Sequence, residues 1–136
     1  MDSECARLDE ARRAVAKGGL TRANKNALFH AAHDIKGEAA TLGHPLVEGV
    51  AKNLCRLIEH TRDQAGIPVV LIDQHVDAIL AIVRAPTNFA AARLAGRLTS
   101  ELTRVTAEYL IREDMSALGT DYRVDSPPLA PDSATR

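Results

Sequence analysis

Aromatic residues are scarce in this chain of 136 residues, which contains no tryptophan, two phenylalanines and two tyrosines. Apolar residues still make up 46% of the composition, so alanine, leucine, valine and isoleucine must build the interior. Such short side chains suit closely packed helices, and no segment shows a convincing strand pattern. The length is that of one ordinary domain with a proper core.

The chain also lacks a charge excess, a long apolar run and a cysteine motif. Its formal net charge of −1 gives no reason to expect nucleic acid or an anionic membrane as a partner, although a local basic patch is not excluded. The longest apolar run, IPVVLI at 67–72, is too short to span a bilayer. Cys5 and Cys55 are expected to be reduced thiols. Because the charged first segment contains no signal peptide, we expect a cytoplasmic protein.

Apolar residues at helical spacing, bounded by capping residues and breaks, predict helices along most of the chain. The first segment, 3–19, ends at a pair of glycines and carries few large apolar residues. The predicted fold is all-α: an up-down antiparallel four-helix bundle with a short N-terminal cap helix and a long C-terminal helix. The four longer helices are expected at 21–42, 45–61, 69–84 and 87–115.

We expect a single helical domain over 1–115 and a disordered C-terminal tail over 116–136. The tail is rich in proline and serine and has almost nothing to bury. Helix 87–115, which Thr87 can cap, carries apolar residues in steps of four and three, like a coiled-coil seam. It could seal the bundle, pair with a second copy as a homodimer or bind another partner. The seam consists of Leu94, Leu98, Leu102, Val105 and Tyr109.

A histidine, a lysine and a glycine lie close together in HAAHDIKGEAATLG, residues 30–43 of helix 21–42. If Ile35 marks the core direction, His33 points about 160° away from it, toward solvent. Lys36 and Gly37 follow on the next turn, on either side of His33. Glycine inside a helix costs about 0.5–1 kcal/mol relative to alanine, so something offsets that loss or the position must be small.

The outer strip of helix 21–42 around His33 is small and partly apolar, which is typical of a docking surface. An exposed neutral imidazole can attack phosphorus through a ring nitrogen, and Lys36 would stabilise the charge of the transferred group. Taken singly, Lys36 is a solvated charge and Gly37 a relief of packing; together with an outward histidine they favour phosphoryl transfer. The rest of the outer strip is Asn26, Phe29, His30 and Ala40.

The segment AHDIKGEAATLG at 32–43 resembles the signature of histidine-containing phosphotransfer (HPt) domains, which serve in multistep bacterial phosphorelays. Downstream segments extend the resemblance to about residues 5–84. The resemblance implies that His33 is phosphorylated, that Lys36 assists and that Gly37 clears space for the partner. It implies a response-regulator receiver domain and a hybrid histidine kinase as partners, with no kinase activity in the module itself. No cofactor or metal is expected.

Two positions depart from the family pattern. Glu38 stands where the family usually has a small residue, although the helical wheel places it on the shoulder away from His33. Cys55 aligns with an acidic or amide side chain that orients the imidazole in some relatives. A thiol does that poorly.

Two alternative functions stay open. His30, His33 and His44 could contribute to a metal site, although no further ligand is seen to converge on them. A domain that keeps the shape without the chemistry could instead bind a receiver or kinase as a regulator. The remaining histidines, His60 and His75, are expected at helix ends or on polar faces and need no special role.

Overall fold

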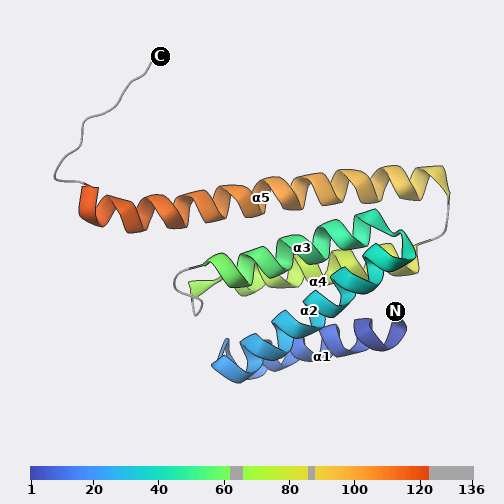
Figure 1. Ribbon diagram of the computed structural model, residues 1–136, viewed down its shortest axis with the longest axis horizontal. Helices are drawn as coiled ribbons and strands as arrows, with labels where there is room; N and C mark the ends of the chain where they lie inside the picture. The colour runs from blue at the N-terminus through green and yellow to red at the C-terminus, as the bar shows by residue number, and fades with distance from the viewer. Residues whose placement is uncertain (62–65, 86–87, 123–136) are drawn as a thin grey trace, which may run out of the picture.

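The computed structural model describes residues 1–61, 66–85 and 88–122, and within them the fold is helical throughout (Figure 1). The predicted all-α class is therefore confirmed. None of the helices in these ranges is long and apolar enough to cross a membrane. The helices are α1 (Asp2–Gly18), α2 (Arg22–Leu42), α3 (Pro45–His60), α4 (Val69–Arg84) and α5 (Phe89–Tyr122).

The ends of α2 follow from its terminal residues. Thr21 caps the first turn, since its Oγ1 accepts a hydrogen bond from the backbone N–H of Asn24 at 3.2 Å. Gly43 ends the helix with a left-handed φ of 68°, a conformation that glycine adopts without strain. Pro45 then starts α3, where its missing N–H leaves no hydrogen bond unmade.

Helix α1 is a full member of the bundle rather than a short cap, which corrects that part of the prediction. It packs against α2 and α4, and α3 packs against the same two helices, so α1–α4 form a closed ring of four. Its 17 residues include the buried Leu8 and Val15, and its other buried residues, Cys5 and Ala11, are small. Helix α5 lies outside this ring, against α3 and α4 (Figure 1).

Helix α5 begins and ends later than predicted. It starts at Phe89, where the side chain of Asn88 accepts a hydrogen bond from the N–H of Ala91 at 2.8 Å. The predicted capping residue, Thr87, lies outside the described residues. The helix continues to Tyr122, so residues 116–122 are helical rather than part of a disordered tail, and 123–136 lie outside the described residues.

The predicted apolar seam of α5 is only partly buried. Leu102 is 4% exposed, whereas Leu94 is 68% and Leu98 39% exposed. The buried side of the helix is shifted and uses smaller residues, because α5 rests on a ring that is already complete. Pairing with a second copy stays a prediction, and it would bury Leu94 and Leu98. Among the α5 residues whose burial is described, 90–114, the buried ones are Ala95, Leu102, Thr106 and Leu110.

The inward face of α2 is the one that its apolar spacing predicts, with one exception. Leu28 and Ile35 are completely buried, and the alanines between and after them let α1 and α3 approach closely. Leu42, which the same spacing places inward, is the last residue of the helix and is 62% exposed. With this face against the core, the opposite face of α2 is left for solvent.

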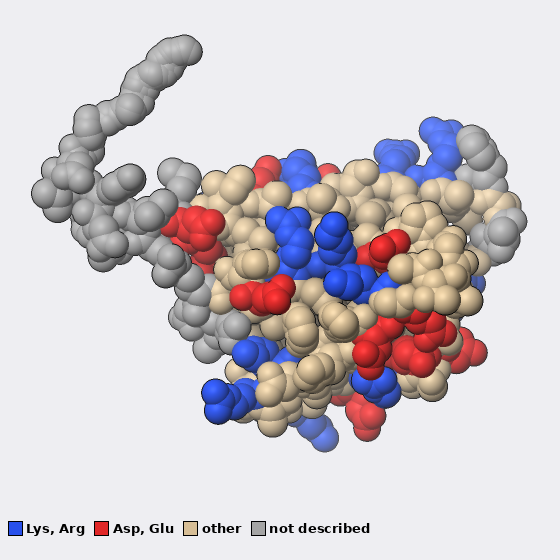
Figure 2. All heavy atoms as spheres, in the orientation of Figure 1, with Lys and Arg blue, Asp and Glu red and all other residues tan. Residues whose placement is uncertain are grey.

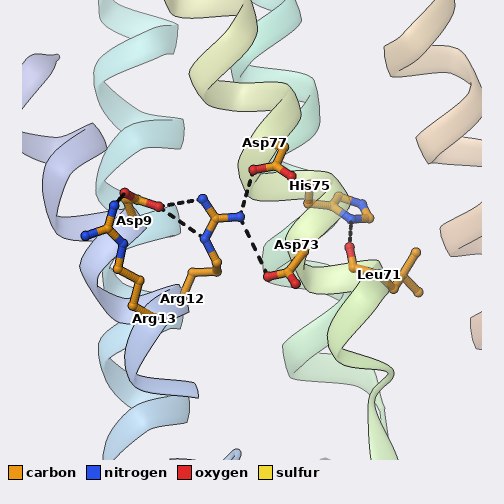
Figure 3. Close-up of polar contacts among 7 residues, drawn as sticks. All are labelled: Asp9, Arg12, Arg13, Leu71, Asp73, His75 and Asp77. Atoms are coloured by element: carbon orange, nitrogen blue, oxygen red, sulfur yellow. Dashed lines mark hydrogen bonds and ion pairs between the residues drawn. The ribbon is translucent and has the colours of Figure 1, made fainter. Parts of the chain in front are cut away.

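An arginine holds α1 against α4 at the edge of the ring (Figure 3). The Nη1 atom of Arg12 lies 2.7 Å from an oxygen of Asp77 and 3.7 Å from one of Asp73, both on α4. Its Nε donates to Asp9 on α1 at 3.1 Å, which lowers the pKa of that carboxyl group. The Arg12 side chain is 19% exposed whereas that of Asp77 is 65% exposed, so the arginine is partly shielded from water and this partner is not. The contact between α1 and α4 therefore includes a polar cluster in addition to the buried apolar residues of the two helices.

His75 is completely buried, which corrects its predicted place on a polar face. Its Nδ1 lies 2.8 Å from the carbonyl oxygen of Leu71 within α4 (Figure 3). Its Nε2 lies 3.0 Å from the hydroxyl of Thr106 on α5. Burial lowers the pKa of His75, and the Leu71 carbonyl opposes that shift. The neutral imidazole of His75 therefore connects α4, in the four-helix ring, to α5.

We expect acid to destabilise the protein partly through His75. Its folded-state pKa lies below the ordinary value of 6.5, so the unfolded chain takes up the proton first. The free energy of unfolding should then fall as the pH drops below 6.5, by at most about 1.4 kcal/mol per pH unit from this group. Urea unfolding at pH 7.5, 6.5 and 5.5 measures the slope.

The variant His75→Asn should lose part of this pH dependence, while His60→Asn, which changes an exposed histidine, should keep it. Only the slopes are compared, because removing a buried ring also changes the stability at every pH. Equal slopes in the wild type and His75→Asn would contradict the expectation.

Candidate functional site

The outer face of α2 presents an imidazole to solvent. Ile35 is completely buried while His33 and Gly37 are exposed, so the outward direction predicted for His33 is confirmed. Lys36 is half-buried on the next turn. These three side-chain positions therefore lie together, with His33 uncovered.

Gly37 is not required by packing within the described chain. A Cβ atom built there meets no atom within 4 Å outside the neighbouring helix backbone. Its φ is helical, so no strained backbone calls for glycine either. Relief of internal packing therefore does not account for Gly37, and the space beside His33 is open to the outside.

Across from α2, Cys55 on α3 is buried, with 5% of its surface exposed. Burial raises the pKa of this thiol to about 11, while the positive charge of Lys36 opposes the shift. The thiol is thus neutral at neutral pH, and Lys36 is near enough to act on it. No hydrogen bond joins Cys55, or any other described residue, to His33. Because the Cys55 thiol is buried and neutral, it is poorly suited to orient the exposed imidazole of His33.

The imidazole of His33 instead contacts an aromatic ring one turn earlier on α2. The rings of Phe29 and His33 have centroids 5.9 Å apart and planes inclined by 28°, an offset stack. His30 meets the same phenyl ring edge-on at 5.8 Å. Phe29 is partly buried and packs against the core, so it is anchored below the two histidines.

Three of the four predicted docking residues line one shallow hollow between α2 and α3, of about 330 Å³. Ala40 is exposed but lies farther along α2, outside the hollow. Lys25, Ile58 and Glu59 were not predicted. The short α2–α3 connection could have indicated the α3 residues, since it makes the start of α2 face the end of α3. The lining residues are Lys25, Asn26, Phe29, His30, Ile58 and Glu59.

Glu38 does not obstruct the imidazole. Its Oε2 accepts a hydrogen bond at 2.8 Å from the α-amino group of Met1, the residue before α1, and this contact raises the pKa of the amino group to about 10. The carboxylate is therefore directed toward α1, on the shoulder that the helical wheel predicts.

The alternative metal site is not assembled. Among the residues that the structure describes, no group of three or more histidine, cysteine, aspartate or glutamate side chains could hold a metal ion. His44 precedes α3 and lines a different hollow, together with Ile82 and Ala95. His30 and His33 thus have no third ligand in the described part of the chain.

Charge is unevenly spread on the face shown in Figure 2. Lysine and arginine side chains gather over α3, while acidic side chains gather toward the end where α1 begins. The net charge of −1 conceals this separation.

Comparison with known proteins agrees with this geometry. The family model described as "Hpt domain" matches residues 2–86, well over half of the chain. No curated protein and no solved structure matches the chain. The matched range covers the four-helix ring α1–α4, with the exposed histidine on α2, and ends before α5. The chain therefore belongs to the Hpt domain family, whose domains are histidine phosphocarrier modules of phosphorelays rather than kinase domains.

Proposed function

We propose that this protein relays a phosphoryl group between the aspartates of receiver domains and that His33 carries it. The observation that supports the proposal most is the exposed imidazole of His33 beside the open position of Gly37, on a chain of this family. A hybrid histidine kinase, which carries such a receiver domain, would be the source of the group.

In the proposed step, a ring nitrogen of neutral His33 donates its lone pair to the phosphorus of an aspartyl phosphate. The N–P bond forms as the P–O bond to the aspartyl oxygen breaks, and that electron pair stays on the departing carboxylate. The other ring nitrogen keeps its proton, so the ring becomes positively charged beside the anionic phosphoryl group. The reverse step returns the group to a second receiver.

Lys36 and Gly37 have different proposed roles. The ammonium group of Lys36 would offset the negative charge of the phosphoryl oxygens during transfer and afterwards. Gly37 would let the receiver domain bring its aspartate up to the ring. The partner would dock on the outer strip formed by Asn26, Phe29, His30 and Ala40.

The test is transfer from receiver domains of the source organism, each labelled with [³²P]acetyl phosphate. We expect at least one of them to pass label to the protein, and the resulting linkage to be labile in acid and stable in base. Unlabelled receiver added afterwards should remove the label. If no receiver transfers label, the proposal is wrong, and a receiver that binds without transferring would identify a regulator instead.

A further inference from the structure

We propose that Phe29 is a positioning residue for this transfer, because its ring holds the imidazole of His33 in the orientation that receives the phosphoryl group. The inference rests on the proposed function. It starts from the offset stack of the two rings, 5.9 Å between centroids and 28° between planes. Among the hydrogen bonds, ion pairs and ring contacts of the described residues, this stack is the only one that His33 makes.

An exposed histidine without a polar partner would otherwise sample several rotamers. The residue aligned with an orienting side chain, Cys55, is buried, and its neutral thiol makes no hydrogen bond to His33. Phe29 can orient the imidazole instead, because its own ring is fixed by packing against the core and by the edge-on contact with His30. A fixed wall on one side reduces the freedom of the imidazole before the partner arrives.

Stacking also leaves the reactive atoms free. The lone pair of an imidazole nitrogen lies in the plane of the ring, so a neighbour against the ring face does not cover it. The ring gains positive charge as the N–P bond forms, and the face of an aromatic ring attracts a cation. The contact thus orients His33 and favours its charged product without obstructing the approach over Gly37.

The experiment compares Phe29→Leu with Phe29→Tyr, which keeps an aromatic ring. Transfer from the labelled receiver is measured over a range of receiver concentrations. We expect Phe29→Leu to lower the maximal transfer rate about five-fold, since a stacking contact of this kind is weak but acts directly on the imidazole. Phe29→Tyr should restore most of the rate. If Phe29 served only docking, the half-saturating concentration would change and the maximal rate would not.

NMR of the unphosphorylated protein gives a second measurement that needs no transfer. In Phe29→Leu, the ring protons of His33 should lose the chemical-shift change that the neighbouring aromatic ring causes. The scalar couplings of the His33 side chain should take values averaged over several rotamers. In Phe29→Tyr both signals should stay near those of the wild type. Thermal melting checks that each variant is folded.

The possible failures can be told apart. A wild type that accepts label, with an unchanged maximal rate in Phe29→Leu, would overturn the positioning role and leave the proposed function standing. A wild type that accepts no label from any receiver would overturn the proposed function. An unaltered His33 rotamer in Phe29→Leu would overturn the inference whatever the transfer assay shows.

Discussion

Replacing His33 with glutamine is expected to abolish acceptance of the phosphoryl group while leaving the bundle folded. Glutamine offers no nucleophilic ring nitrogen, so the label should fall by at least about 100-fold. The stability should change by less than about 0.5 kcal/mol, because the side chain is exposed and its ring contact with Phe29 is a weak stack. Transfer from the labelled receiver and thermal melting measure the two effects.

The controls for this variant are the two other histidines near α2. His30→Gln keeps the reactive ring but alters the docking hollow, and His44→Gln changes a residue beyond the end of α2. Both should still accept label. Label retained in His33→Gln would show that the phosphoryl group is carried elsewhere.

Substitutions of Gly37 are expected to change stability and transfer in opposite directions. A Cβ atom meets nothing at this helical position, so Gly37→Ala should raise the free energy of unfolding by about 0.5–1 kcal/mol. Gly37→Leu places a large side chain on the open side of His33 and should slow transfer, on the order of 100-fold, through misplacement of the partner. Urea unfolding and the initial rate of labelling measure these effects.

Gly96 on α5 supplies a matched control, since a Cβ atom there also meets nothing within 4 Å. Gly96→Ala should raise the stability similarly, and Gly96→Leu should leave transfer unchanged because it lies outside the range that matches the family. Normal transfer in Gly37→Leu would remove the role proposed for this glycine. A collapse of its melting temperature would show that the position belongs to the packed interior.

The orientation of the candidate site could be predicted because it depends on a local period. Leu28 and Ile35 recur at helical spacing, so burying them turns His33 outward whatever α2 packs against. The ends of α2 could be predicted for the same reason, because Thr21 and Gly43 act on the backbone of their own helix. The motif of His33, Lys36 and Gly37 also lies within one short stretch of α2, so the sequence alone was enough to predict the family.

The place of α1 and the surroundings of His75 depend on residues far along the chain. Arg12 meets Asp73 and Asp77 on α4, and these contacts make α1 part of the ring rather than a cap. The buried ring of His75 finds a polar partner in the hydroxyl group of Thr106, which lies on α5. Spacing within one helix carries no information on such partners.

The sequence alone thus determined the helices, their apolar faces and the outward histidine, because hydrophobic period and capping act within a few residues. Only the tertiary structure decided which four helices close the ring and that the seam of α5 leaves Leu94 and Leu98 exposed. Those features depend on how separate surfaces fit and on which rotamers the packed neighbours allow. Such complementarity has no counterpart in the order of residues along one helix.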